Sequence, residues 1–272
     1  MRVVKAYKKT NLAYWNEMAE RHVDSDGYQT AAFRKGANIL DPIVRRGIGK
    51  VRGKKLLHLQ CHFGLDTLSL ARMGAEVTGL DFSDTAIATA KAISKETGVK
   101  GKFIQSDVLN PPKSLTGYDI VFASWGAFCW IHDMHAWMRT AARALKKGGR
   151  IYFAEAHPYL MTLDDWPATP ALPFNVRYDW DSRTPIELEN QGDYAGPGTL
   201  KAHKNIMFLH GMETILNAMI GAGFRIDSLD QGHHIPWMGL KQLVKADKDY
   251  WTLPPGAPII PLALMVNATK IR

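Results

Sequence analysis

Two aspartates follow consecutive apolar segments of the chain, at positions where carboxylates can bind a nucleoside. Asp81 ends the segment AEVTGLD (75–81), and Asp107 ends KFIQSD (102–107). A carboxylate after the second strand of an alternating α/β unit can accept hydrogen bonds from both hydroxyls of a ribose. A carboxylate after the third strand, with a neighbouring backbone N–H as donor, can recognise the amine and a ring nitrogen of adenine. Together the two acids predict an adenosine-containing ligand.

The residues that follow these two segments also have interpretations that involve no ligand. Asp81 could only help to cap the next helix, but Ser83 already occupies the N-cap position of a helical segment at 84–97. Asp107 alone could be an exposed loop acid, and Phe82 fits against an adenine face or in the core. The order of two acids after two consecutive strands favours nucleoside binding.

The first predicted strand leads into the loop HLQCHFGLDT (58–67). A strand-to-helix turn of this kind brings backbone N–H groups and a helix N-terminus close to a ligand. Glycine usually provides the backbone freedom for that approach, and Gly64 is the only glycine of this loop. On its own, the loop fits an ordinary strand-to-helix turn nearly as well.

The segment IYFAEAHP (151–158) holds the acid–base candidates. Alternation along a strand puts Glu155 and His157 on one face, with His157 at the carboxyl end of the strand. An imidazole there could accept a proton from a substrate, with Glu155 orienting the ring. The alternative is that His157 hydrogen-bonds the next segment and only holds it in place.

Aromatic side chains gather in two places where they could line a pocket. Trp125, Phe128 and Trp130 follow the apolar segment YDIVFAS (118–124), and residues 159–205 are dense in proline, aromatic and acidic residues. We predict that Phe128, Trp130 and Tyr194 contact a substrate, and that residues 159–205 form an insertion that covers it. A folded core would also accommodate these aromatic residues.

These residues lie at the ends of elements that alternate along the chain. The alternation predicts βαβ units and a parallel sheet with helices on both faces, closed by a final antiparallel pair. Ligands bind at the carboxyl ends of the strands of such a sheet. Strands are predicted at 55–60, 75–81, 102–107, 118–124, 150–156, 224–230 and 260–269, with shorter ones at 174–180 and 201–209. Helices are predicted at 11–22, 30–46, 67–73, 84–97, 133–146 and 211–222.

The length of 272 residues fits one large domain with an insertion. We expect an N-terminal helical cap at 1–54 and an α/β domain at 55–272 that includes the insertion at 159–205. The net charge is +8, and residues 1–54 hold twelve Lys or Arg against five Asp or Glu. This basic segment could face an anionic substrate, a nucleic acid or a membrane surface, or only water.

The composition argues against several classes of protein. No apolar run reaches the length of about eighteen residues that would span a membrane. Two cysteines, Cys61 and Cys129, are too few for a disulfide framework or a metal cage, which favours a reducing, cytoplasmic location. The ten histidines form no set with carboxylate or cysteine partners, so we expect no metal.

From residue 55 to 158 the chain resembles the class I S-adenosylmethionine-dependent methyltransferases, especially those that act on small molecules. The shared motifs are the acids after the second and third strands, the apolar run YDIVFAS and the sequence LKKGG (145–149). The resemblance implies a Rossmann-like fold with a mostly parallel seven-stranded sheet, S-adenosylmethionine as cofactor and S-adenosylhomocysteine as product. It also implies that the cofactor contacts Gln60, His62, Gly64, Asp66, Asp81, Phe82, Asp107, Val108, Ser124 and Trp125.

The first loop departs from the usual pattern of this family, which is an acid followed by three glycines. His58 stands in place of the acid, and Gln60 and His62 stand in place of the first two glycines. The loop is similar to that of a subgroup with the sequence LQCHFGLDT, so we interpret it as a variant. Asp66 either binds the ammonium group of the cofactor or caps the helix that follows.

The resemblance implies methyl transfer to a small-molecule acceptor, which the basic segment allows to be anionic. A nucleic-acid methyltransferase is disfavoured because the NPP motif at 110–112 follows the third strand rather than the fourth, where such enzymes hold a flipped base. A nicotinamide dehydrogenase is disfavoured because the G-x-G-x-x-G turn is absent. A cofactor-binding protein without catalysis remains an alternative. We expect a monomer or a homodimer.

Overall fold

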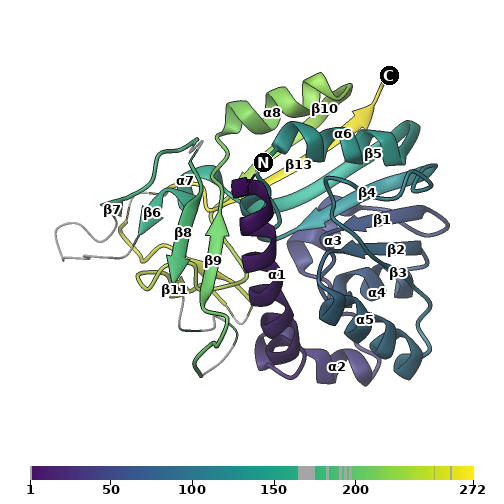
Figure 1. The fold of residues 1–272 in the computed structure, drawn as a ribbon, viewed down its shortest axis with the longest axis horizontal. Coiled ribbons are helices and arrows are strands. Elements are labelled where there is room, and N and C mark those ends of the chain that lie inside the picture. Colours follow the sequence, from purple (N-terminus) through teal and green to yellow (C-terminus); the bar gives the residue numbers. More distant parts are fainter. Residues whose placement is uncertain are drawn as a thin grey trace.

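The computed structural model describes residues 2–164, 175–181, 184–189, 192, 195, 198–247, 249–257 and 259–272. Its centre is a seven-stranded sheet in the order β10-β13-β5-β4-β1-β2-β3 (Figure 1). Strands β1 to β5 are parallel, and β13 runs antiparallel to both β5 and β10. The predicted Rossmann-like sheet and its final antiparallel pair are therefore confirmed. The strands are β1 Lys55–Leu59, β2 Glu76–Asp81, β3 Lys102–Gln105, β4 Tyr118–Ser124, β5 Leu145–Ala156, β10 Phe224–Gly232 and β13 Ala263–Lys270.

Helices α6 (Met134–Ala144) and α8 (Met212–Gly221) cover one face of this sheet (Figure 1). They pack on side chains that point the same way from β1, β4 and β5, namely Leu57, Val121 and Phe153. Because side chains alternate along a strand, their neighbours point to the opposite face. The sheet is thus buried on both sides, as parallel sheets require.

The opposite face carries α3 (Pro42–Ile48), α4 (Leu65–Arg72) and α5 (Asp84–Thr97). Leu56 of β1 and Phe122 of β4 lie in the same buried cluster as residues of α3 and α4. The predicted N-terminal cap therefore includes one helix, α3, that lies on the sheet itself. The boundary of this cap at residue 54 stays a prediction.

Local signals explain where the helices begin and end. The predicted helix 84–97 is confirmed, because the Ser83 hydroxyl accepts the Ala86 N–H at 3.0 Å and Gly98 ends the helix in a left-handed conformation. The predicted helix 133–146 ends at residue 144, since Leu145 pairs with Tyr118 in the sheet.

The predicted helix 30–46 is two helices, α2 (Thr30–Arg34) and α3. The chain turns between them at Gly36, which has a φ of +101°. Asp41 then caps α3, accepting the Val44 N–H at 3.0 Å, with proline in the first helical position. These cap and turn residues break the apolar periodicity from which a single helix was predicted.

Helix α1 (Arg2–His22) begins earlier than the predicted residue 11 and lies between the sheet and the hairpin of β8 and β9 (Figure 1). Tyr7, like Tyr14 and Met18, is buried and extends the apolar face toward the N-terminus. The Asn11 amide binds the backbone of Ile206 in β9 through two hydrogen bonds of 2.8 Å. The helix thereby joins the first residues of the chain to the predicted insertion.

The predicted insertion contains short strand pairs rather than the longer strands expected at 174–180 and 201–209. Residues 165–174, which hold much of its proline and aromatic content, lie outside the described residues, and so does Tyr194. In the described part of the chain, no helix is long and apolar enough to cross a membrane. The remaining elements are α7 Pro158–Met161, β6 Leu163–Asp164, β7 Asn175–Val176, β8 Ile186–Glu189, β9 Lys204–Met207, β11 Val244–Lys245, β12 Trp251–Thr252 and the 3-10 turns Asp26–Tyr28 and Phe128–Trp130.

Both the backbone conformation and the close packing at Gly64 favour glycine, and substitutions at Gly64 and at Gly98 can separate the two effects. Its φ is +77°, and an added Cβ would lie 2.5 Å from the Phe103 ring. Gly98 has a φ of +68° with open space around it. We expect Gly98→Ala to lower the free energy of unfolding by about 1 kcal/mol, the cost of a left-handed residue, and Gly64→Ala by about 1–3 kcal/mol more, from overpacking. Urea denaturation measures both, and equal losses would contradict the close packing on Phe103.

Candidate active site

The turn after β1 keeps the backbone of a glycine-rich loop although two of its residues are not glycine. Gln60 and His62 have φ values of +55° and +52°, followed by Gly64 at +77°. Residues with side chains rarely adopt this left-handed conformation, whereas glycine does so readily. Gln60 and His62 occupy the positions where the resembling family has its first two glycines. The turn therefore has a glycine-type backbone with glutamine and histidine at two of its positions.

The side chains of Gln60 and His62 are used in different ways. The Gln60 amide donates to the Ala127 carbonyl at 2.7 Å and accepts from the Trp137 indole at 2.8 Å, which ties the loop after β1 to the loop after β4. The His62 ring packs against Trp15 and Tyr28. Burial holds the pKa of His62 well below its usual value, so the ring is neutral, and its Nε2 is buried without a partner among the described residues.

Asp81 lies at the end of β2, as predicted, and joins two loops there. Its carboxylate accepts the His62 N–H at 2.8 Å on one oxygen and the Ser83 N–H at 3.0 Å on the other. The residue is only 6% exposed, and burial raises its pKa to about 6. The Phe82 N–H also bonds to this carboxylate, and since a carboxylate offers about four acceptor positions, one is left for a further donor such as a ribose hydroxyl.

Asp107 lies beyond the end of β3, where α1 reaches it. Lys8 forms an ion pair with one carboxylate oxygen, and the other accepts the Leu109 N–H at 2.9 Å. The Lys8 and Asp107 side chains are 37% and 33% exposed, and an ion pair this open to water contributes at most about 1 kcal/mol. Helix α1 thus covers this acid through a contact that a ligand can displace at low cost.

Two further residues of α1 cover the neighbouring loops. The Trp15 ring meets the His62 ring edge-on, with 5.3 Å between the centroids. The Asn16 side chain accepts the Ser83 hydroxyl at 2.6 Å and donates to Asp84 at 2.8 Å. The helix therefore lies over the loops that follow β1, β2 and β3.

The residues at these strand ends fit an adenosine-containing cofactor. Three polar groups there could bind such a ligand: an acceptor position on Asp81, the weakly held Asp107, and the Nε2 of His62, which has no partner in the described part of the chain. Phe82 is half-buried beside them. The Val108 side chain is buried in the core cluster that also holds α6. Only the backbone of Val108 could therefore make its predicted contact with the cofactor.

Asp66 and Ser124 lie together between the loops after β1 and β4. The Ser124 hydroxyl donates to the Asp66 carboxylate at 2.9 Å, and burial raises the pKa of Asp66 to about 6. Helix α4 is capped by Gly64 with no side-chain hydrogen bond, so the alternative that Asp66 caps this helix is wrong. Its predicted contact with an ammonium group stays a prediction.

The chain turns sharply after β4 at two residues with positive φ, Trp125 at +39° and Gly126 at +79°. The Trp125 ring meets Trp237 edge-on, and its indole nitrogen is buried without a partner in the described residues. Glu155 of β5 fixes the turn, because its carboxylate accepts the N–H groups of residues 126, 127 and 128 at 2.7, 2.7 and 3.1 Å. Burial outweighs these bonds and raises the pKa of Glu155 to about 7.

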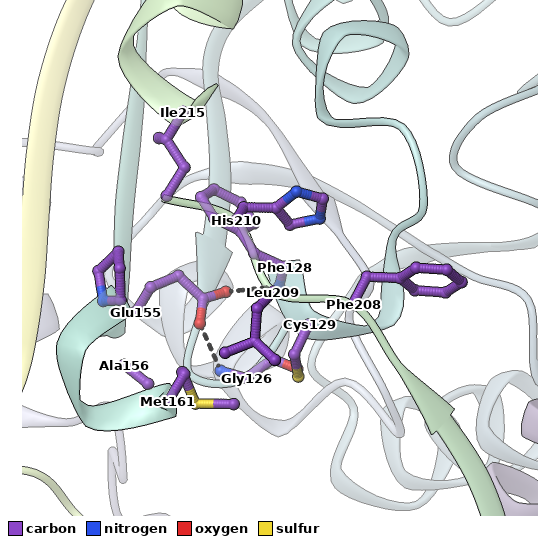
Figure 2. A pocket seen from close by; sticks show the side chains of 11 residues that line it. Gly126, Phe128, Cys129, Glu155, Ala156, Met161, Phe208, Leu209, His210 and Ile215 are labelled. Carbon is purple, nitrogen blue, oxygen red and sulfur yellow. Dashed lines mark hydrogen bonds between the residues drawn. The ribbon is translucent and has the colours of Figure 1, made fainter. Parts of the chain in front are cut away.

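Beside this turn lies a small cavity of about 30 Å³, at the carboxyl ends of β4 and β5 (Figure 2). Phe128 lines it, as predicted for a pocket residue, together with Glu155 and His210. Trp130 instead packs on α1, with its ring 5.9 Å from Tyr14. The remaining predicted pocket residue, Tyr194, lies outside the described residues. The other apolar walls are Met161, Phe208, Leu209 and Ile215.

His157 is fully buried at the end of β5, and both of its ring nitrogens have partners. Nδ1 accepts the Tyr159 N–H at 3.1 Å, which caps α7, and Nε2 lies 3.0 Å from the Gln231 side-chain amide. Burial lowers the pKa of His157 to about 4. Gln231, rather than Glu155, orients the ring. This geometry favours the role of holding the following segment over that of a general base.

His210 lines the cavity but was not among the predicted site residues. It lies between β9 and α8, one residue before the N-cap Gly211, and no motif marks it. The only feature of the sequence that could have pointed to His210 as a site residue is its position just before the predicted helix at 211–222. Among the residues that the structure describes, no three His, Cys, Asp or Glu side chains lie together as a metal site would need.

Known sequences support these observations over part of the chain. Residues 56–149 match the model of a family described as a methyltransferase domain. A ubiquinone biosynthesis O-methyltransferase of Proteus mirabilis is 32% identical over 141 residues, which cover 52% of this chain and 57% of that protein. Its counterpart in Yersinia pestis is 29% identical over 143 residues, covering 53% and 59%. The chain thus spans little more than half the length of these curated relatives.

Solved structures extend the likeness to most of the chain. An S-adenosylmethionine-dependent methyltransferase from Mesorhizobium loti has a TM-score of 0.58 at 22% identity, covering 87% of this chain and 99% of that one. Geranyl diphosphate C-methyltransferase from Streptomyces coelicolor, in complex with S-adenosyl-L-homocysteine, has a TM-score of 0.51 at 12% identity, covering 88% and 79%. At these identities the likeness is one of fold. The matched domain and the strand order show that this chain has the fold of the class I S-adenosylmethionine-dependent methyltransferases, the family that its sequence resembles.

Proposed function

We propose that this chain transfers the methyl group of S-adenosylmethionine to a small-molecule acceptor. The observation that carries the proposal is the pair of carboxylates, Asp81 and Asp107, at the ends of β2 and β3, beside a loop with a glycine-type backbone. The curated relatives are named as O-methyltransferases of ubiquinone biosynthesis, which supports an oxygen atom as the acceptor. We further propose a cytoplasmic monomer or homodimer.

In this proposal, Asp81 holds the ribose hydroxyls, Asp107 the adenine amine, and the backbone of residues 60–64 approaches the cofactor closely. Asp66, with Ser124, binds the ammonium group at the amino-acid end. When bound, the cofactor supplies a sulfonium methyl group that is already activated for in-line displacement. The chain's task is therefore to orient the two reactants, which lowers the barrier by several kcal/mol. Helix α1 and the segment after β5 exclude water from the site.

The acceptor is proposed to bind at the carboxyl ends of β4 and β5, next to the turn at 125–126. The cavity there is mostly apolar and small, which favours a compact molecule over a polynucleotide. Transfer to RNA or DNA, or cofactor binding without catalysis, are the competing possibilities. Binding to generic RNA that is tight and falls steeply with salt would support the first of these.

Asp81→Ala tests the cofactor site. Losing two charge-assisted hydrogen bonds to the ribose is expected to weaken binding of S-adenosylmethionine by about 2 kcal/mol, roughly 30-fold. Asp84→Ala, which removes an exposed acid three residues away, is the matched control and should leave affinity within about twofold. Isothermal titration calorimetry measures both variants, with circular dichroism to verify folding. An Asp81→Ala protein that binds as tightly as the unaltered chain would remove the main support for the proposal.

Lys8→Met tests whether α1 competes with the cofactor for Asp107. Without the ammonium group, the adenine amine no longer has to displace an ion pair worth up to about 1 kcal/mol, so affinity for S-adenosylmethionine should rise up to about fivefold. Lys9→Met changes the neighbouring exposed lysine and should have no effect. Calorimetry at low and moderate salt checks the result. Weaker binding by Lys8→Met would instead make Lys8 part of the cofactor site.

We propose the structural role for His157, and the pH dependence of stability tests it. Because the folded pKa of about 4 lies below the ordinary 6.5, the unfolded chain takes up a proton in this window and the native state does not. The neutral His157 therefore contributes fully to the free energy of unfolding above pH 6.5. This contribution, up to about 3 kcal/mol, is lost as the pH falls toward 4. Asn at 157 can still cap α7 but cannot titrate. Urea denaturation at several pH values should show a smaller loss on acidification for His157→Asn, whereas equal losses would contradict the assignment.

A further inference from the structure

The cavity beside the turn after β4 has three polar lining residues, and two of them are already committed. Glu155 accepts three backbone N–H groups. The Cys129 thiol lies 3.7 Å from the Gly126 carbonyl, and burial raises its pKa well above the usual value, so it stays neutral. His210 is the third polar residue of the lining (Figure 2).

A single hydrogen bond fixes the tautomer of His210. Its Nε2 lies 2.6 Å from the Ile131 carbonyl, and a carbonyl can only accept, so Nε2 carries the proton. The lone pair is therefore on Nδ1, which has no hydrogen-bond partner among the described residues. The backbone bond from Phe208 N–H to the Cys129 carbonyl, at 2.8 Å, holds this segment against the turn. A neutral imidazole with a fixed lone pair thus borders the cavity.

The charged and titratable neighbours of His210 come from several elements. Asp181 accepts from the Gly211 N–H and the Thr214 hydroxyl at the start of α8, and Asp133 caps α6. His132 is bound to the Tyr7 hydroxyl at 2.7 Å. The two acids raise the pKa of His210, but burial outweighs them and lowers it. Nδ1 is consequently unprotonated at neutral pH.

We propose that His210 is the general base of the methyl transfer, and that the acceptor is an uncharged molecule with a hydroxyl group on an apolar body. This inference rests on the proposed function and gives its acceptor a chemical class. Nδ1 takes the hydroxyl proton while the oxygen forms a bond to the methyl carbon. The bond that breaks is the one from this carbon to the sulfonium sulfur, which keeps the electron pair. The products are a methyl ether, an uncharged thioether and a protonated His210.

The walls of the cavity explain why the acceptor is uncharged. Phe128, Met161 and Ile215 offer only apolar surface, and burial raises the pKa of Glu155 to about 7, so the lining carries little charge to pair with a charged acceptor. No Lys or Arg lines the cavity in the described part of the chain. A cavity of about 30 Å³ has room for a hydroxyl group, since about 10–15 Å³ already holds one water molecule.

The test compares His210→Gln with the unaltered chain on two probes, catechol and thiophenol. Catechol keeps its O–H proton at neutral pH, whereas thiophenol is largely ionised and needs no base. Glutamine can still donate to the Ile131 carbonyl but has no basic nitrogen. His135→Asn, at an exposed histidine of α6, is the matched control.

We expect His210→Gln to lower turnover of catechol roughly 100- to 10,000-fold and to leave thiophenol turnover within about threefold. In the unaltered chain, kcat with catechol should fall at acidic pH, and only below the ordinary imidazole value of 6.5 because burial lowers the pKa of His210, since protonated Nδ1 cannot accept a proton. Thiophenol is compared only at neutral pH and above, because the thiol itself takes up a proton at lower pH. If His210→Gln does not fold, the pH profile with catechol and the ¹⁵N NMR of the unaltered chain decide.

A readout without turnover comes from ¹⁵N NMR of histidine-labelled protein. His210 should be neutral at pH 7 with its proton on Nε2, and catechol should shift its Nδ1 resonance. Equal losses on both probes, a proton on Nδ1, or a chain that binds S-adenosylmethionine yet methylates neither probe would each overturn the inference. A chain that does not bind S-adenosylmethionine in calorimetry would instead remove the proposed function.

Discussion

The buried carboxylate of Glu155 is the contact on which the site most depends. Moving a carboxylate out of water costs several kcal/mol unless other donors replace the lost water, and three backbone N–H groups of residues 126–128 do so. These groups belong to a turn that contains two residues with positive φ, Trp125 and Gly126. The buried charge and the strained turn therefore stabilise each other. One wall of the cavity, and the position of the loop after β4, follow from this arrangement.

Helix α1 connects the two halves of the site. On one side it contacts the acids and loops after β2 and β3 through Lys8 and Asn16. On the other side, Asn11 binds the backbone of β9, and Tyr7 packs on Phe208 in the segment that leads to His210. A single helix thus touches both the proposed cofactor site and the wall of the proposed acceptor site. Its ion pair with Asp107 is weak. By contrast, the Asn11 side chain bonds both backbone groups of Ile206, as a neighbouring strand would.

The sequence contained what was needed to predict the sheet and the acids at its strand ends. Apolar runs and caps such as Ser83 are local signals, and Asp81 follows directly from its strand. The partners of the site residues could not be predicted, because they are distant in sequence: Gln231 for His157, and Lys8 for Asp107. His210 has no motif, since only the docking of residues 208–210 on the turn gives it a role.

The left-handed residues after β1 have a consequence for the unfolded chain. Glycine at 60 and 62 would relieve a conformational cost of about 1 kcal/mol at each position. It would also give the denatured ensemble more backbone freedom, which lowers the stability of the native state by a similar amount. Glutamine and histidine here restrict that ensemble and add the bonds of Gln60 to Ala127 and Trp137. Two departures from a glycine-rich sequence can therefore leave the folding equilibrium almost unchanged while making the loop stiffer.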